Sequence, residues 1–187
     1  PVAGSVSIGG RDVADMRPRE RARLVSFMSQ DSSQPFPFSV LEILLMGRYP
    51  HLGRFERESA ADRENARRAL AYVGLAGLEQ RQFSALSGGE RQLVLFATCL
   101  MQDTPCVLLD EPSSSLDIRH QDRIFSMSQE LAREGRAVVA SVHNLDVAAQ
   151  YCTRLLLLEK GRAAADGSPQ DVLAPTTLDR VYGVRTM

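Results

Sequence analysis

Short apolar runs alternate with longer amphipathic segments along most of this chain, and this alternation is the first guide to its fold. Residues 24–28, 107–109, 137–142 and 155–158 form apolar runs of the length that strands have. Segments with helical spacing of apolar residues lie between these runs, which indicates an α/β protein with a parallel sheet. We expect 107–109 to be a strand buried on both faces and 137–142 to be a second buried strand.

The first residues show a different pattern. Ser5 to Ile8 alternates polar and apolar side chains and is followed by Gly9 and Gly10, which predicts a strand and a turn. Residues 17–23 are strongly charged and predict a short exposed helix. A charge run of this kind more often forms a solvated face than a binding patch.

The segment from about 39 to 86 predicts helices and no strand. Prolines interleaved with phenylalanines at 35–38 discourage a helix until Ser39, which is an N-cap candidate for a helix over 40–46. Residues 57–73 are rich in Ala, Arg and Glu and place apolar side chains along one helical face. We therefore expect a helical subdomain inserted at about 39–86 in a single domain that spans 1–187.

Helical spacing of apolar residues also predicts the remaining helices. Gly135 ends one of them, and Asn144 and Ser168 are N-cap candidates for two others. The expected segments are 90–101, 118–134, 144–151, 169–173 and a last helix that starts at Thr177 or a neighbour and ends at Tyr182.

Composition limits the classes of function. The 187 residues suffice for about one domain, and 44% hydrophobic content suffices for a core. A net charge of −1 does not favour nucleic acid or an anionic membrane surface as the main partner. Three widely spaced cysteines favour buried thiols over disulfides or a metal site. The longest aliphatic run, 155–158, is far shorter than a membrane span, and we expect neither a membrane-spanning segment nor a secretory signal.

The stretch with the clearest chemistry begins at Ser87, Gly88 and Gly89. These residues precede a segment with helical spacing, so the glycines are expected at a helix N-terminus. Unpaired N–H groups and the positive end of the helix dipole favour an anion there, and glycines allow a phosphate close to the backbone. This stretch is therefore a candidate phosphate site.

Two carboxylates follow the apolar run at 107–109. Asp110 and Glu111 stand at its end, before Pro112, and a polar loop from Ser113 to Asp117 comes next. Ligands of open α/β sheets bind at the carboxyl ends of the strands. An isolated Asp-Glu pair is more often a solvated strand end or a helix cap, but here it follows a candidate phosphate loop directly.

The combination resembles the ATP-binding-cassette (ABC) ATPases, which have a P-loop NTPase-like core. LSGGE is similar to their signature motif, VLLDE to their Walker B strand and SSLD to their D-loop. Gln30 matches the Q-loop glutamine and His143 the switch histidine, so the resemblance extends over nearly the whole chain. It implies that the first strand belongs to a small antiparallel β subdomain and that 39–86 is the family's helical subdomain.

The resemblance implies a role for each matching residue, with ATP and Mg²⁺ as cofactors. Asp110 would hold Mg²⁺, Glu111 would be the general base for the attacking water, and Gln30 would contact the metal and sense the nucleotide. His143 would hydrogen-bond the γ-phosphate.

The signature motif would act between subunits. Ser87, Gly88 and Gly89, with Glu90 beside them, would bind the γ-phosphate of ATP held by a second subunit. This implies a head-to-tail homodimer, in which Asp117 would communicate across the interface.

The segment GRYPHLGRF at 47–55 is similar to ATPases that serve importers of iron–siderophore complexes, haem and cobalamin. Arginine and aromatic residues, which this segment contains, are enriched at the centres of protein–protein interfaces. We therefore expect Arg48, Tyr49, His51 and Phe55 to dock a membrane permease. The protein would then be peripheral, on the cytoplasmic face of the inner or plasma membrane, with no nucleic acid partner.

The sequence departs from the family in one respect: G-x-x-x-x-G-K-[ST] occurs nowhere in it. We interpret the chain as an N-terminally truncated cassette and expect these residues alone to be inactive. Two alternatives stay open. One is a soluble cassette ATPase that acts on nucleic acid or ribosomes, and the other is a non-catalytic interaction module without a P-loop.

Overall fold

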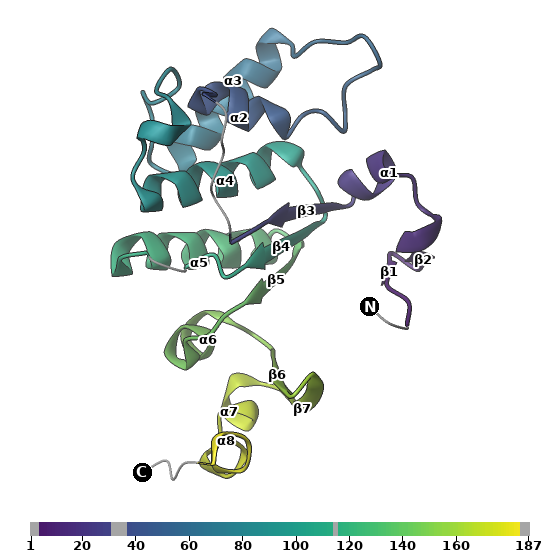
Figure 1. Cartoon of the computed structure of the whole chain (residues 1–187), viewed down its shortest axis with the longest axis vertical. Coiled ribbons are helices and arrows are strands. Elements are labelled where there is room, and N and C mark those ends of the chain that lie inside the picture. Colours follow the sequence, from purple (N-terminus) through teal and green to yellow (C-terminus); the bar gives the residue numbers. More distant parts are fainter. Residues whose placement is uncertain (1–3, 31–36, 114–115, 184–187) are drawn as a thin grey trace. The chain divides into compact units, whose positions relative to one another are not determined.

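The computed structural model describes residues 4–30, 37–113 and 116–183. The chain divides into two compact units, Pro1–Ser141 and Val142–Met187, which we treat one at a time. Figure 1 shows the order of the elements along the chain.

The first unit begins with a small antiparallel hairpin of β1 (Ser7–Ile8) and β2 (Arg11–Asp12). A single 3₁₀ turn, Val13–Asp15, follows, and its N-cap Asp12 accepts a hydrogen bond from the backbone of Ala14. The short helix α1 (Pro18–Ala22) then starts with proline at its first turn. The predicted strand, turn and short charged helix are therefore confirmed.

A parallel three-stranded sheet is the centre of the first unit and confirms the predicted α/β class. Its strands are β3 (Val25–Met28), β4 (Cys106–Asp110) and β5 (Ala137–Ser141), in the order β3-β4-β5. The register brings the carboxyl ends of β4 and β5 together, with Asp110 opposite Ser141. The chemistry-bearing residues therefore meet at one edge of the sheet.

Two helices cover one face of this sheet. They are α4 (Gly88–Gln102) and α5 (Ile118–Arg133), whose apolar side chains join the core with Met28, Val107 and Leu109. Alternation along a strand places every second side chain on this face. The hydrophobic core lies here.

The other face of the sheet is less covered than we expected. Phe27, Leu108 and Val139 form one row across the three strands. Phe27 is 59% exposed, Val139 is 58% exposed and Leu108 is half-buried. The prediction that 107–109 is buried on both faces is therefore wrong for Leu108, and the predicted burial of 137–142 is wrong for Val139, because apolar character alone does not show which face of a strand is packed.

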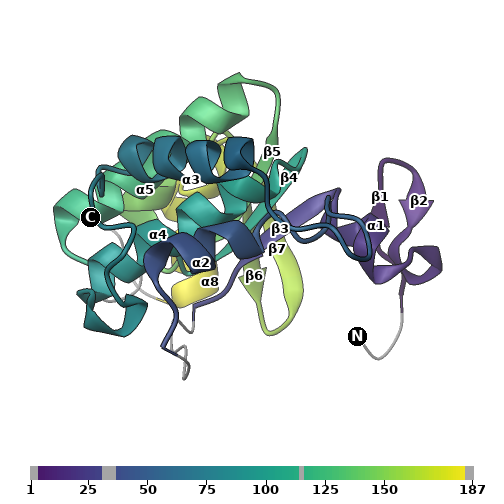
Figure 2. The same cartoon turned by 90° about the horizontal axis from the view of Figure 1, so that it is seen from above.

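The predicted helical segment contains α2 (Val40–Met46), α3 (Ala60–Tyr72) and a 3₁₀ turn at Phe83–Ala85. The start of α2 is hydrogen-bonded to the segment that precedes the 3₁₀ turn, because the amide of Val40 donates to the carbonyl of Arg81. Helices α2, α3 and α4 lie side by side (Figure 2). The boundaries 39–86 and the single-domain organisation stay predictions.

Capping decides where α2 and α3 begin. Ser39 caps α2 as expected, and Glu42 completes a capping box. Ser59 caps α3 in the same way with Asp62, so this helix starts three residues later than the predicted Arg57. At the end of α2, a methyl group on Gly47 would lie 2.6 Å from the carbonyl oxygen of Thr98, so only glycine allows this close approach to α4.

The second unit contains an antiparallel hairpin and three short helices. A bidentate ion pair between Arg154 and Asp166, with both N···O distances 2.8 Å, links the start of the first strand of the hairpin to the end of its second strand. The last helix starts at Pro175 rather than near Thr177, because proline is well suited to the first helical position. The elements are α6 (Leu145–Tyr151), β6 (Leu155–Glu159), β7 (Arg162–Gly167), α7 (Pro169–Val172) and α8 (Pro175–Tyr182).

The cysteines are free thiols in the structure. Cys99 is buried, and burial raises its pKa to about 12. Cys106 and Cys152 are half-buried, and burial raises the pKa of each. A raised pKa keeps a thiol protonated and unreactive, which agrees with a structural role.

Candidate active site

The two predicted carboxylates lie at the carboxyl end of β4. Asp110 is its last residue and Glu111 follows directly. The hydroxyl of Ser141, at the end of β5, donates to Asp110 Oδ1 at 2.7 Å and accepts from the Glu111 backbone N–H at 2.9 Å. Ser141 therefore holds the side chain of one acid and the backbone of the other.

Glu111 has an unusual backbone conformation. Its φ of 46° lies in the left-handed region, which costs a residue with a Cβ about 1–3 kcal/mol. The hydrogen bond from its N–H to Ser141 helps to hold this conformation. Strain of this kind concentrates at functional sites, where it fixes the direction of a side chain.

Gln30 points at the candidate base. Its Nε2 donates to Glu111 Oε2 at 2.8 Å, although the two residues are 81 positions apart. The structure thus brings together three predicted site residues, Gln30, Asp110 and Glu111. Their carboxylate and amide oxygens are the kind of ligand that Mg²⁺ prefers.

Gln92 is a site residue that sequence reasoning missed. It is buried on α4, and its Nε2 lies 3.4 Å from the carbonyl oxygen of Gln30. Its Oε1 has no hydrogen-bond partner among the described residues. Gln92 thereby joins the helix of the LSGGE motif to Gln30, and its place two residues after that motif was the available signal.

The predicted phosphate loop forms the N-terminus of α4, as expected. Ser87 is the N-cap and Glu90 closes a capping box: Glu90 Oε2 accepts from the Ser87 N–H at 2.7 Å, and the Glu90 N–H donates to Ser87 Oγ at 3.3 Å. The hydrogen bond from Ser87 N–H is the main reason that the pKa of Glu90 lies below its usual value. Glu90 therefore shapes the turn, and a carboxylate is not itself a donor to phosphate.

The two glycines of this turn differ in their surroundings. No described atom lies within 4 Å of a methyl group placed on Gly88, so a phosphate could approach there. A methyl group on Gly89 would instead lie 2.9 Å from Cγ of His120 in α5. A side chain at position 88 would therefore occupy open space, whereas one at position 89 would collide with His120.

Asp117 is the N-cap of α5. Its Oδ1 accepts from the backbone N–H of His120 at 2.9 Å, and this bond is the main cause of its lowered pKa. Ser114 and Ser115 of the same loop lie outside the described residues. The intersubunit role of Asp117 stays a prediction.

His143 belongs to the second unit and directly precedes Asn144, the N-cap of α6. Asn144 Oδ1 accepts from the backbone N–H groups of Asp146 and Val147. The position of His143 relative to Asp110 and Glu111 stays a prediction.

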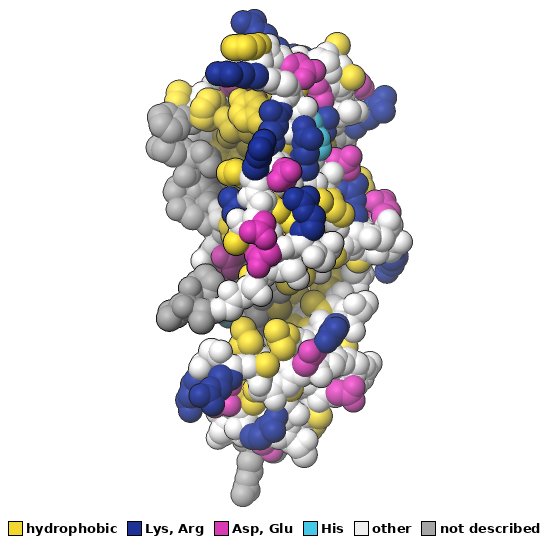
Figure 3. Space-filling model, turned by 90° about the vertical axis from the view of Figure 1, so that its right-hand side faces the viewer, with side chains coloured by type: hydrophobic (Ala, Val, Ile, Leu, Met, Phe, Trp, Pro, Cys, Tyr) yellow, Lys and Arg dark blue, Asp and Glu magenta, His cyan; other side chains and the backbone are white. Residues whose placement is uncertain are grey.

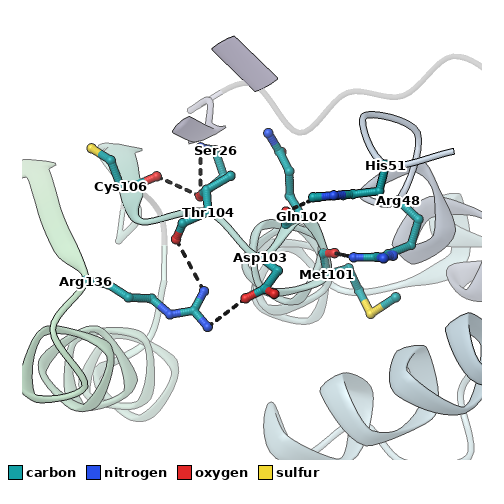
Figure 4. A network of polar contacts seen from close by, with 9 residues as sticks. All are labelled: Ser26, Arg48, His51, Met101, Gln102, Asp103, Thr104, Cys106 and Arg136. Carbon is teal, nitrogen blue, oxygen red and sulfur yellow. Dashed lines mark hydrogen bonds and ion pairs between the residues drawn. The ribbon is translucent and has the colours of Figure 1, made fainter. Parts of the chain in front are cut away.

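Arg48 and His51 are half-buried, and both contact the end of α4. The guanidinium of Arg48 donates to Asp62 Oδ1 at 2.8 Å and to the carbonyl of Met101 at 3.2 Å. Nε2 of His51 lies 2.8 Å from the carbonyl oxygen of Gln102, to which it donates. Figure 4 shows both side chains directed at the C-terminal end of α4.

Arg136 reaches the same region from the start of β5. Its Nη1 donates to the carbonyl of Thr104 at 3.4 Å, and its Nη2 donates to Asp103 at 2.9 Å. Cationic side chains at a helix C-terminus satisfy unpaired carbonyls and complement the helix dipole. The network therefore holds α4 in place at the end opposite to its signature motif (Figure 4).

Comparison with known proteins agrees with this geometry. Residues 1–114 match the family described as ABC transporter. The chain is 41% identical to a cobalamin import ATP-binding protein, BtuD, of Halobacterium salinarum, over 99% of this chain and 46% of that protein. It is 42% identical to a hemin import ATP-binding protein, HmuV, of Gloeobacter violaceus, over 100% of this chain and 70% of that protein.

A solved structure is also similar. An inward-facing metal-chelate type ABC transporter matches 87% of this chain and 64% of its own, with 33% identity and a TM-score of 0.80. This chain belongs to the ABC transporter family. It spans less than half the length of the Halobacterium relative. No helix in the described part of the chain is long and apolar enough to cross a membrane.

Proposed function

We propose that this chain is part of the ATP-hydrolysing subunit of an importer for a metal chelate. The observation that carries the proposal is the cluster of Gln30, Asp110 and Glu111, held by Ser141 at the carboxyl edge of the sheet. A helix N-terminus with an open Gly88 supplies the second half of a phosphate site.

Glu111 is suited to the role of general base. Its carboxylate is fixed by a strained backbone and by the amide of Gln30, so it can orient a water molecule for attack on phosphorus. Gln30 positions this carboxylate, and Ser141 keeps Asp110 directed at the same edge. His143 is proposed to complete the site by donating to the γ-phosphate.

The donor set also fits Mg²⁺. No group of three or more His, Cys, Asp or Glu side chains gathers among the described residues. Mg²⁺ usually takes only one or two carboxylates and completes its shell with waters and phosphate oxygens. Asp110 and Gln30 would hold it, and when bound it would neutralise charge on the phosphates.

The signature motif is proposed to act on the nucleotide of a second subunit, in a head-to-tail homodimer. Gly88 and Gly89 are the first residues of α4, where backbone N–H groups have no helical carbonyl partners. Such groups bind phosphate well. Glu90 and Ser87 would keep the turn in shape for this contact, and Asp117 would act across the interface.

The permease is proposed to dock on the loop at 47–55, through a narrower set of residues than the sequence indicated. Tyr49 is 57% exposed and Phe55 is 91% exposed, with Arg54 stacked on Phe55 at 5.6 Å. A groove of about 410 Å³ lies between Tyr49, Arg54 and Arg19. Figure 3 shows basic and apolar side chains close together on one face of the first unit.

The loop is anchored from beneath. Nε of Arg19 and Nε of Arg23 both donate to the carbonyl of Pro50, at 2.9 Å and 2.8 Å. A surface that presents aromatic side chains on a fixed backbone loses little entropy on binding. The partner would be a cytoplasmic segment of a membrane permease, which would hold the protein at the cytoplasmic face of the membrane.

The cargo is proposed to be a metal chelate such as haem, cobalamin or an iron–siderophore complex. The support is that the relatives bear names of haem and cobalamin importers and that the similar solved structure is of metal-chelate type.

Glu111→Gln in the full-length protein tests the catalytic proposal. The amide keeps the shape of the side chain and removes the base, so we expect turnover to fall by at least about 10²-fold with ATP binding retained. ATP-bound dimers should then accumulate, as gel filtration with ATP would show. ATP hydrolysis at a near wild-type rate would refute the role of Glu111.

A further inference from the structure

The side chain of His120, in the first turn of α5, lies against the first turn of α4. The ring of His120 lies over the backbone of Gly89: a methyl group on Gly89 would be 2.9 Å from Cγ and 3.0 Å from Nδ1 and Cδ2 of the imidazole. Carbon atoms in ordinary contact are about 3.5–4.0 Å apart. The imidazole therefore occupies the space that a side chain at position 89 would need.

His120 is held in this position by Asp117. Its Nδ1 lies 2.7 Å from Asp117 Oδ1, and its backbone N–H donates to the same oxygen at 2.9 Å. Because an ionised carboxylate only accepts, Nδ1 must carry the hydrogen. The ring cannot turn away from Gly89 without breaking this bond.

Backbone conformation does not explain the glycine at position 89. Gly89 lies within α4 and is not among the glycines with positive φ. Its neighbour Gly88 has open space where a methyl group would stand. The contact with His120 is therefore a reason for glycine at position 89 that position 88 does not share.

We propose that His120 is a positioning residue that locks the signature motif to Asp117 at the N-terminus of α5, so that the first turns of α4 and α5 move together within one subunit. The proposal rests on the proposed function, since it concerns how a γ-phosphate of the second subunit meets these two segments. His120 acts through Gly89 and Asp117 and is not itself a catalytic residue.

A double-mutant cycle in the full-length protein tests the proposal. Gly89→Ala, His120→Ala and the double variant are compared by kcat and KM for ATP. We expect Gly89→Ala to lower kcat at least tenfold in the wild-type background and less than threefold in the His120→Ala background.

Conservative variants separate positioning from mere packing. His120→Asn retains a donor in place of Nδ1 and should keep kcat within about threefold of wild type. His120→Leu fills the space without a donor and should lose at least tenfold in kcat. Gly88→Ala is the matched control, since its cost should be the same with or without His120.

The outcomes are distinguishable. If Gly89→Ala costs the same in the wild-type and His120→Ala backgrounds, phosphate approach alone explains the glycine and our inference is wrong. If His120→Asn and His120→Leu behave alike, the bond to Asp117 has no role and the inference is equally wrong. A wild-type protein that does not hydrolyse ATP would instead overturn the proposed function.

Discussion

At the scale of single residues, the geometry of the acidic pair depends on a side chain that belongs to none of the matched motifs. Ser141 contacts both Asp110 and the backbone of Glu111 from the neighbouring strand. Residues that orient metal or catalytic ligands typically contribute about 10–100-fold. We therefore expect the hydroxyl of Ser141 to contribute to activity by a similar factor.

Ser141→Ala in the full-length protein should lower kcat for ATP hydrolysis by about 10–100-fold, because Asp110 and the strained backbone of Glu111 lose their common partner. Ser128→Ala is a suitable control, since the Ser128 hydroxyl donates only to the carbonyl of Ile124 within α5. Steady-state kinetics of the two variants decides the matter. Equal activity of both would show that Ser141 does not position the acids.

At the scale of elements, α4 connects the signature motif with the loop at 47–55 that we propose as a docking surface. Its N-terminus carries the signature motif, and its C-terminus is held by Arg48 and His51, which flank the exposed Tyr49. Gln92 in its middle contacts Gln30. A displacement of the loop would therefore be passed to α4 directly.

The loop at 47–55 is expected to separate into a structural and a docking part. Arg48→Ala should destabilise the protein by about 1.5–3 kcal/mol, because charged hydrogen bonds to Asp62 and Met101 are lost. Tyr49→Ala with Phe55→Ala should leave the thermal midpoint unchanged and should weaken co-purification with a membrane partner. Midpoints and partner yield from solubilised membranes are the measurements. Loss of stability in the aromatic variant would contradict this division.

Asp62, in the first turn of α3, should make the stability of the protein depend on pH. Hydrogen bonds from the Ser59 side chain and backbone, followed by Arg48, lower the pKa of Asp62 from its usual 3.8. A carboxyl group with a lowered folded pKa stabilises the fold above its unfolded pKa, and this stabilisation is lost as pH falls through the folded value.

Asp62→Asn should therefore destabilise the protein at pH 7, and the difference from wild type should shrink below about pH 3.8. Thermal midpoints measured from pH 7 to pH 3 test this. Exposed Glu64→Gln on the same helix serves as control. A constant difference across this range would show that the ionised form of Asp62 is not what matters.

At the scale of the whole molecule, residues 1–187 contain no G-x-x-x-x-G-K-[ST] motif, and one row of side chains on the sheet is exposed. Phe27 and Val139 are more than half exposed in that row. Contiguous exposed apolar surface promotes association. These features predict both weak nucleotide binding and aggregation for residues 1–187 alone.

Calorimetric titration of residues 1–187 with MgATP should show binding weaker than the micromolar range. A loss of three hydrogen bonds to charged phosphates, at about 1.5–3 kcal/mol each, weakens affinity by roughly three to six orders of magnitude. Phe27→Ser with Val139→Ser should reduce light scattering, whereas Tyr49→Ser should not. A micromolar dissociation constant would mean that the phosphate site lies elsewhere.

Much of this protein was determined by local sequence. Capping residues such as Ser39, Ser87 and Asn144 placed helix starts, and the apolar runs placed the strands, because these signals act between residues close together in the chain. The motifs also pointed to Gln30, Asp110 and Glu111 before any contact between them was visible.

Only the tertiary structure decided which long-range contacts those residues make. Ser141 and Gln92 acquire their roles from strand register and helix packing, which join positions 30 to 62 residues apart. Arg48 and His51 looked like surface residues until the structure showed carbonyls at the end of α4 as their partners. The spacing of apolar residues shows which face of a helix or strand is apolar. It does not show which residue packs against that face, because this depends on how the whole unit folds.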